Sequence, residues 1–240
     1  SLTDEIYLAP RGSKKPYRLI NDSGLDLNVW ISDPSDKEKR EGMISLKSNT
    51  VEYWEFEDWK SIRERLDTDR TRSIFGVGID GELYTNTMTI DATFEGELLH
   101  VLHPAVNQVH NRIICELVCK DDNVKDITFR STLLLENITG IPIRFKAIKL
   151  DNDKSVEFII PPSENKSVPV EFAYASNIYV QPVTENEYEW SPHPIVWKHL
   201  LNTPASVDCT QKNDTDSKQI FFEVNAKYDR REPLAKIYPH

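Results

Sequence analysis

The chain has 240 residues, enough for one large domain or two modest domains with cores of their own. Its 29 Lys and Arg against 39 Asp and Glu give a formal net charge of −10, which disfavours nucleic acids and anionic membranes as main partners, because both require a basic surface. With 39% hydrophobic and 28% charged residues, the composition is that of a globular protein. The sequence has no apolar run of the roughly 18 residues that a membrane-spanning helix needs.

Residues 1–12 are interpreted as a leader that precedes the first structural unit. They contain no basic stretch followed by an apolar one, so no secretory signal peptide is visible. Because the sequence begins with Ser1 and not with Met, we expect it to be a piece of a longer protein, whose targeting signal would lie elsewhere.

A repeated pattern begins at Tyr17. The segments Tyr17–Val29 and Leu133–Phe145 both alternate apolar residues around a central Asn-x-Ser/Thr-Gly motif. Their asparagines, Asn21 and Asn137, lie 116 residues apart (137 minus 21). At the same spacing three further pairs of identical residues match: Asn49 with Asn165, Glu55 with Glu171, and Phe56 with Phe172.

The spacing between the two copies shortens further along the chain. Ile74-Phe75 aligns with Ile178-Tyr179 at an offset of 104, which leaves an insertion of about 12 residues (116 minus 104) within 57–73 of the first copy. Near the ends of the copies, Cys115-Glu116 aligns with Phe222-Glu223 at an offset of 107. Because such spacing indicates tandem repeats, we predict a first unit at residues 13–130 and a second at 131–240.

Within each unit, apolar residues alternate with polar ones in short runs that Asp, Asn, Ser and Pro turns separate. This period of two is typical of half-buried strands in antiparallel sheets. The sequence therefore predicts an all-β fold made of two tandem antiparallel β-sandwich repeats. Only two short helices are indicated, one inside the insertion with Trp59, Ile62 and Leu66 on one face, and one that begins at Ser191-Pro192 and carries Trp197, Leu200 and Leu201.

Three cysteines, Cys115, Cys119 and Cys209, cannot all pair with one another. Such a low, odd number favours a reducing compartment. Cys115 and Cys119 flank three residues of a strand-like run, where the period of two places them on one face. We interpret both as buried, unreactive thiols.

The Asn-x-Ser/Thr-Gly motif is predicted to form a turn in each unit. Gly24 and Gly140 would supply a positive φ without steric cost. The amides of Asn21 and Asn137 are placed to accept from a backbone N–H and donate to a carbonyl, so that they lock the turn or bridge to a neighbouring strand. The alternative interpretation is that these amides also shape a peptide-binding edge.

Metal and catalytic sites find little support in the sequence. His100, His103 and His110 are the candidate histidines, but positions 100 and 103 of a strand point to opposite faces and cannot share an ion. The acidic pairs Asp67/Asp69, Asp151/Asp153 and Asp214/Asp216 each offer too few oxygens for a cation. No nucleophile elbow, phosphate-binding glycine loop or His-Glu-x-x-His motif is present. We therefore expect neither a metal, nor a cofactor, nor an enzymatic activity.

Aromatic residues are the remaining indication of a binding site. Tyr53, Trp54, Phe56 and Trp59 cluster in the first unit, although most large rings in a sandwich belong to its core. In the second unit, the run Val168–Tyr174 alternates like a strand and contains Pro169, which removes a backbone donor and is typical of an edge strand. Because an edge strand can capture an extended peptide, the predicted peptide-binding residues are Asn21, Asn137, Val170, Phe172 and Tyr174.

The repeated strand–Asn-x-Ser/Thr-Gly–strand pattern resembles the adaptor-binding (VAB) repeats of the vacuolar protein sorting thirteen family. Glu189-Trp190-Ser191 and the closing run Ile220–Val224 add to the resemblance, which extends from about Lys15 to His240. One asparagine per repeat is the hallmark of this family, and Asn21 and Asn137 match it. The Trp-Ser pair of the second copy has no evident match in the first copy. The second copy, in turn, lacks the insertion that the first copy has at 57–73.

The resemblance implies a function in protein recruitment. Members of this family are large rod-shaped proteins that move lipids between organelles at membrane contact sites, and their repeats bind Pro-x-Pro motifs of adaptors on particular organelles. It implies that this chain holds two of several tandem repeats, is cytoplasmic and peripheral to organelle membranes, and depends on Asn21 and Asn137 for recruitment. We expect the peptide to add a strand at a sheet edge near the seam between the units. A Pro-x-Pro segment suits this mode of binding, because it is already extended and loses little conformational entropy when it binds.

Two other functions stay open at this stage. A calcium- or lipid-dependent membrane-binding sandwich would gather its acidic loops at one tip and be stabilised by calcium. A purely architectural spacer would bind no peptide in either repeat.

Overall fold

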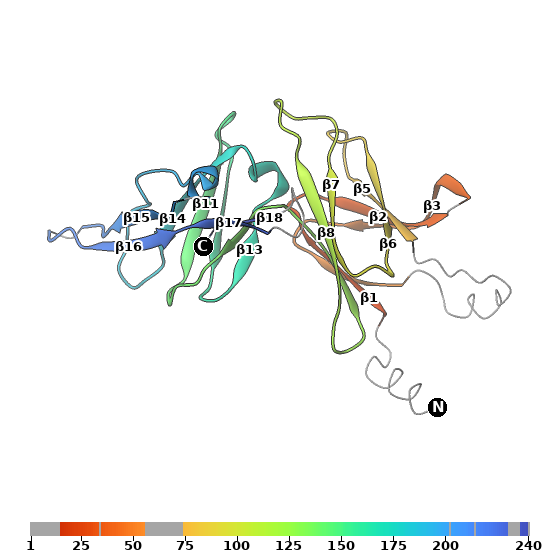
Figure 1. Ribbon diagram of the computed structural model, residues 1–240, viewed down its shortest axis with the longest axis horizontal. Helices are drawn as coiled ribbons and strands as arrows, with labels where there is room; N and C mark the ends of the chain where they lie inside the picture. The colour runs from red at the N-terminus through yellow and green to blue at the C-terminus, as the bar shows by residue number, and fades with distance from the viewer. Residues whose placement is uncertain are drawn as a thin grey trace. The chain divides into compact units, whose positions relative to one another are not determined.

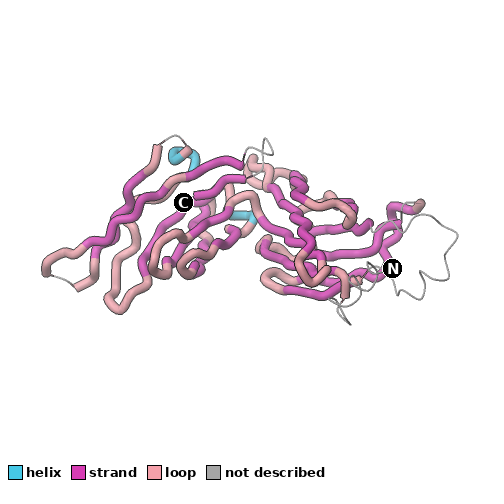
Figure 2. Tube along the Cα trace, turned by 60° about the horizontal axis from the view of Figure 1, so that its bottom comes forward, coloured by secondary structure: helices cyan, strands magenta, loops and turns pink. Residues whose placement is uncertain are grey.

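The computed structural model describes residues 15–33, 35–55, 74–201, 203–213, 215–229 and 236–239. The predicted leader and the insertion at 57–73, with its helix and the residues Phe56, Trp59, Asp67 and Asp69, lie outside the described residues. The chain divides into two compact units, residues 1–130 and 131–240. Strands joined by loops make up nearly all of the described chain, so the predicted all-β class is confirmed (Figures 1 and 2). Within these residues, none of the helices is both long and apolar enough to cross a bilayer.

Unit 1 consists of two sheets. The five-stranded sheet has the order β4-β1-β9-β8-β7, and the four-stranded sheet has the order β3-β2-β5-β6. All neighbours are antiparallel except β1 and β9, which run parallel. The strands are β1 (Tyr17–Asp22), β2 (Leu27–Asp33), β3 (Asp36–Leu46), β4 (Val51–Trp54), β5 (Ile74–Ile79), β6 (Thr87–Asp91), β7 (Gly96–Val101), β8 (Arg112–Cys119) and β9 (Lys125–Arg130).

The core of unit 1 lies between these two sheets. The ring of Trp54 on β4 meets the ring of Phe75 on β5 edge to face, with the centroids 5.8 Å apart. Leu19, Ile127 and Phe129 from the five-stranded sheet are fully buried. The alternation of apolar residues that predicted the strands is therefore the alternation between core and surface.

Unit 2 is divided into smaller sheets. Its strands are β10 (Leu134–Glu136), β11 (Ile143–Lys149), β12 (Ser155–Ile160), β13 (Asn165–Ser167), β14 (Ser176–Pro182), β15 (Ala205–Thr210), β16 (Gln219–Val224), β17 (Ala226–Asp229) and β18 (Lys236–Pro239). They form the sheet β12-β11-β14 and the pairs β10-β13, β15-β16 and β17-β18. One apolar core includes residues of β10, β11, β12, β14, β15 and β16 and Trp197, with the rings of Phe145 and Phe158 stacked inside it.

Two short 3-10 helices stand where the sequence predicted a strand and a longer helix. The segment Val168–Tyr174 was predicted as a strand, and this is wrong: Val170–Phe172 form the 3-10 helix η1. The helix predicted from Ser191-Pro192 is only the four-residue 3-10 helix η2 (Trp197–Leu200), and Val196 precedes it in place of Ser191.

The strand registers also correct the alignment of the two copies. Leu27 and Ile143 differ by 116, but their partners Leu46 on β3 and Ile160 on β12 differ by 114 (160 minus 46). Asn49 therefore corresponds to Ser163, which shares its positive φ, and not to Asn165. Phe75 and Ile178, the partners of Ile31 and Ala147, differ by 103 (178 minus 75), one less than expected. Residues lost in turns cause these slips, which alternation alone does not reveal.

Candidate functional site

Asn21 forms the centre of a buried corner at the end of β1. Its side chain is fully buried, and its Nδ2 donates to the carbonyls of Leu25 (2.7 Å) and Leu46 (2.9 Å). Its Oδ1 accepts from both the backbone N–H and the hydroxyl of Ser23, at 3.1 and 2.6 Å. Its main chain exchanges hydrogen bonds with Asn49 and Thr50. The amide thus ties the β1–β2 turn to the end of β3.

Asn137 makes the same set of contacts in unit 2. Its Nδ2 donates to the carbonyls of Ile141 (2.8 Å) and Ile160 (2.9 Å), while its Oδ1 accepts from the N–H and hydroxyl of Thr139. Its N–H donates to Glu164, and its carbonyl accepts from Ser163. The amide therefore locks the turn and bridges to the end of β12.

The two corners differ at their glycines. Gly24 has a φ of 78°, as predicted for a residue without a side chain, but Gly140 is not among the residues with positive φ, so the prediction for Gly140 is wrong. A Cβ built on Gly140 would meet no atom within 4 Å. The corner therefore depends on the asparagine and on the hydroxyl two residues later, and only in unit 1 on the glycine.

Each corner amide has both of its N–H groups and its oxygen engaged inside the protein. An amide in this state has no free donor, and burial keeps it from touching a peptide on the surface. Asn21 and Asn137 are thus positioning residues. What each one positions is the junction between two strands: β3 and β4 in unit 1, and β12 and β13 in unit 2.

The segment after β13 packs onto the core and does not form an edge strand. Phe172 donates its N–H to the carbonyl of Pro169 at 2.8 Å, so the turn satisfies its own main chain with bonds between residues three apart. Val170 is fully buried. A strand cannot add to such a turn, because its donors and acceptors already point along the helix.

Phe172 and Tyr174 are half-buried by specific contacts. The hydroxyl of Tyr174 accepts from Thr132 at 2.6 Å, and its ring meets that of Trp197 edge to face. The indole Nε1 of Trp197 donates to the carbonyl of Ala173 at 3.1 Å. The ammonium of Lys149 lies 5.5 Å from the centroid of the Phe172 ring. Phe172 and Tyr174 thus pack against the core of unit 2, and Tyr174 meets Trp197, which lines the same pocket as Asn137.

One border of the sheet β12-β11-β14 is covered. Ile195 exchanges main-chain hydrogen bonds with Ile178 on β14, and Ser191 donates its N–H to the carbonyl of Val180. The buried hydroxyl of Ser191 accepts from the N–H of Val180 at 3.0 Å. The Trp-Ser pair singled out in the sequence therefore closes the β14 border, and its ring, on Trp190, lies against the ammonium of Lys146 at 4.2 Å.

The other border, on β12, has no strand beside it among the described residues. Lys149 donates its N–H to the carbonyl of Lys154, which makes this opposed pair hydrogen-bonded. Because such pairs alternate along an antiparallel ladder, the main-chain groups of Ser155, Glu157 and Ile159 point away from β11. Ile159 is also 47% exposed. The sequence signal for this border is the apolar run Phe158–Ile160, where alternation calls for a polar residue at position 159.

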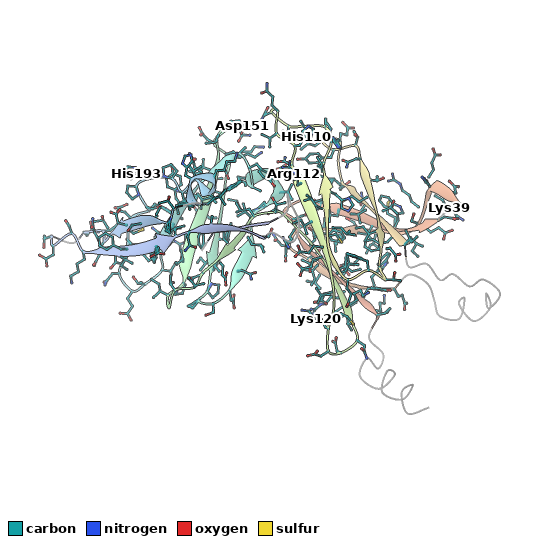
Figure 3. All side chains as sticks on the ribbon, viewed as in Figure 1. Lys39, His110, Arg112, Lys120, Asp151 and His193 are labelled. Atoms are coloured by element: carbon teal, nitrogen blue, oxygen red, sulfur yellow. The ribbon has the colours of Figure 1, made fainter. Side chains whose placement is uncertain are left out.

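The corresponding border of unit 1, on β3, is protected. Its exposed residues include Lys37, Lys39 and Arg40, and its ladder with β2 has a bulge or irregularity between Val29 and Ile31. Figure 3 shows Lys39 on this hairpin. Charged side chains and bulges are the usual devices that keep an edge strand from pairing with another chain. β12 has no such protection over Phe158–Ile160, so unit 2 offers the more receptive edge.

The burial of the three cysteines and the grouping of possible metal ligands can be compared with the expectations from the sequence. Cys115 and Cys209 are buried, and burial raises the pKa of the Cys209 thiol to about 11. Cys119 is exposed, contrary to expectation, because β8 leaves the core at its last residue. In the part of the chain that the structure describes, no three His, Cys, Asp or Glu residues are grouped to hold a metal ion.

Comparisons with known proteins bear on this geometry. The family model described as "Vacuolar-sorting associated protein 13, adaptor binding domain" matches residues 58–240, well over half of the chain. The "Intermembrane lipid transfer protein VPS13" of Chaetomium thermophilum is 29% identical over 249 residues, which cover 100% of this chain and 8% of that protein. The chain thus spans only a small part of that relative.

Two solved structures resemble the chain weakly. Both are of the pilus adhesin SpaC from Lactobacillus rhamnosus GG, one of its C-terminal fragment and one of its open conformation. They are 7% and 8% identical, cover 93% of this chain each and 93% and 30% of their own chains, and both have a TM-score of 0.25. At this level the likeness carries no argument.

Proposed function

The chain belongs to the adaptor-binding domain family of vacuolar-sorting associated protein 13, and from this membership we propose that it is a non-enzymatic module that binds short Pro-x-Pro segments of adaptor proteins. Through these adaptors it recruits a long lipid-transfer protein to organelle membranes and membrane contact sites, where it stays peripheral on the cytoplasmic side. The name of the relative, an intermembrane lipid transfer protein, supports this second part.

The peptide adds a strand to the open border of β12, and this border is the observation that carries the proposal. In an extended chain the main-chain groups of alternate residues point to opposite sides. The residue between the two prolines can therefore donate and accept toward Glu157 or Ile159, while both prolines face solvent, where their missing N–H groups cost nothing. Pro-x-Pro thus suits a sheet border and is unsuited to a position between two strands.

The predicted site residues take separate roles in this proposal. Asn137 fixes the end of β12 by holding the carbonyl of Ile160, and Asn21 does the same for β3 through Leu46. Val170 acts through packing. The half-buried rings of Phe172 and Tyr174 are available to residues that flank the Pro-x-Pro motif.

The variant Ile159→Pro tests the border directly. It removes an outward N–H that the peptide needs, but leaves the ladder between β11 and β12 intact, because proline is tolerated where the N–H of an edge strand faces solvent. We expect at least about a tenfold loss of affinity for a synthetic Pro-x-Pro peptide, measured by titration calorimetry, since the loss of one hydrogen bond and its geometry costs more than about 1.4 kcal/mol.

The matched control is Ser45→Pro on β3. Ser45 is opposite Asn28 as Ile159 is opposite Arg144, so it occupies the same place in unit 1. We expect it to leave the affinity unchanged. Equal affinity of both variants and the parent, with unchanged melting curves, would remove the β12 border from the site, and loss only in Ser45→Pro would move the site to unit 1.

A further inference from the structure

The chain itself contains a segment of the kind that the β12 border is proposed to bind. Among its 14 prolines, Pro192 and Pro194 are the one pair separated by a single residue, so Pro192-His193-Pro194 is the one Pro-x-Pro motif in the 240 residues. It lies in the loop between β14 and η2. We call these three residues the internal motif.

Two buried residues hold the ends of this loop against β14. Ser191 donates its N–H to the carbonyl of Val180 at 2.8 Å, and its hydroxyl accepts from the N–H of Val180 at 3.0 Å. Ile195 donates its N–H to the carbonyl of Ile178 at 2.7 Å and accepts from the N–H of Ile178 at 3.4 Å. Because Ser191 and Ile195 are also buried, they fix both ends of the loop.

Between these two ends the chain must arch away from the sheet. Ser191 and Ile195 are four residues apart in sequence, whereas their partners Val180 and Ile178 are two apart. At about 3.3 Å per extended residue, the loop has about 7 Å of chain more than the stretch of β14 that it spans. Pro192, His193 and Pro194 are all exposed, and Figure 3 labels His193 on this loop. The arch therefore presents the internal motif to solvent.

The main chain of His193 meets the requirement of the proposed binding mode. In that mode the residue between the two prolines donates and accepts toward Glu157 or Ile159. Within the described residues, neither the N–H nor the carbonyl of His193 makes a hydrogen bond. A loop that is held at both ends also loses little conformational entropy when another surface binds it.

The internal motif and the β12 border lie at opposite edges of one sheet. The order of this sheet is β12-β11-β14, and the loop is anchored on β14. A loop with both ends fixed on β14 cannot lie outside β12 of the same chain. The border that it can meet is therefore that of another copy. Such a contact joins two different surfaces, so it is a head-to-tail contact that continues into chains unless a ring closes.

We infer, on the basis of the proposed function, that the β12 border of one copy binds the internal motif of a second copy, with the main chain of His193 paired to Glu157 or Ile159. An adaptor peptide uses the same border. Self-association and adaptor binding therefore exclude each other, and an adaptor must displace the internal motif of a neighbouring copy before it can bind an associated chain.

Sedimentation velocity of the 240-residue chain tests the inference. The chain is measured from about 10 µM to about 1 mM, because a contact of a few residues is expected to be weak. We expect the average mass to rise with concentration beyond that of a dimer, as head-to-tail contacts require. An excess of a synthetic Pro-x-Pro peptide should return the chain to the monomer.

Two proline variants locate the contact on its two sides. His193→Pro removes the N–H of the internal motif, and Ile159→Pro removes an outward N–H of the border. Each variant alone should associate at least about tenfold more weakly than the parent, since each lacks one main-chain hydrogen bond and its geometry. An equimolar mixture of the two should form a dimer that grows no further, because one intact motif then meets one intact border. Ser45→Pro is the control and should associate like the parent.

The His193→Pro variant retains the β12 border, so it should bind the synthetic peptide with the affinity of the parent. If its melting temperature or its peptide affinity falls, the variant Pro192→Gly, His193→Ser, Pro194→Gly replaces it. This variant keeps Ser191 and Ile195 but removes the stiffness of the internal motif, so it should also weaken association.

The outcomes separate this inference from the proposed function. If the peptide binds but the parent stays monomeric, or if association is unchanged in Ile159→Pro, the inference is wrong and adaptor binding stands. If the chain associates through β12 and the internal motif but binds no peptide, the inference holds and the proposed function is wrong. A mixture of the two variants that stays monomeric would also contradict the inference.

Discussion

At the scale of single residues, the corner asparagines show how one amide can hold three segments. Asn137 binds its own turn through Thr139 and Ile141 and the end of β12 through Ile160. Alanine has no group that can replace any of these bonds, so the carbonyls and the Thr139 N–H would lose their partners in a dry environment. An unsatisfied buried polar group costs about 1–3 kcal/mol.

We predict that Asn137→Ala and Asn21→Ala each lower the free energy of unfolding of their own unit by about 3 kcal/mol. Only Asn137→Ala should also weaken Pro-x-Pro binding, because it alone releases the end of β12. Urea unfolding gives the stabilities, and titration of the peptide under conditions where both variants are folded gives the affinities. An Asn137 variant that is destabilised but binds normally would show that the corner does not position the site.

At the scale of elements, the strand pairs β2-β5 and β11-β14 are equivalent, but the large aromatic side chain lies on the first strand of one pair and on the second strand of the other. In unit 1, Trp30 on β2 lies over its partner Gly76 on β5 and is covered by Arg40, whose guanidinium carbon is 4.3 Å from the ring centroid. In unit 2 the equivalent pair is Lys146 and Tyr179, and the aromatic ring stands on β14. The exchange leaves unit 1 dependent on a glycine that unit 2 does not need.

We predict that Gly76→Ala destabilises unit 1 strongly. A Cβ at this position would lie 2.2 Å from the indole nitrogen of Trp30, so the ring must leave its place on the sheet. We expect a loss of about 2–3 kcal/mol and a red shift in tryptophan emission, as for overpacked sites. Gly78→Ala is the graded control, because its Cβ would be 3.3 Å from the same ring and requires only a small adjustment. An equal loss of stability in the two variants would mean that the ring of Trp30 is not held over Gly76.

At the scale of the whole molecule, the two units have separate cores joined at Arg130 and Ser131. A ligand that binds the folded form of one unit stabilises that unit by mass action and leaves the other unaffected. The peptide-binding border belongs to unit 2 in our proposal. Peptide binding should therefore raise the stability of unit 2 and leave the stability of unit 1 unchanged.

We predict that a Pro-x-Pro peptide at about 100 times its Kd raises the free energy of unfolding of unit 2 by about 2.7 kcal/mol and leaves unit 1 unchanged. Hydrogen exchange resolved by segment reports the two units in one experiment, with the fully buried Ile127 of unit 1 and Ile160 of unit 2 in the regions compared. Stabilisation of both units would show that the ligand couples them, and stabilisation of unit 1 alone would contradict the proposed location.

The sequence by itself determined the all-β class, the repeated corner motif and its asparagines, because alternation and a recurring Asn-x-Ser/Thr-Gly are local properties of the chain. Only the tertiary structure decided what lies beside each strand. Val168–Tyr174 alternates like an edge strand, yet Pro169 and the packing of Trp197 turn it into η1. Conversely, Ser191 and Ile195 close the border of β14, whereas β12 has no strand beside it in the described parts of the chain. Whether a border is free depends on segments distant in sequence, and no local pattern records them.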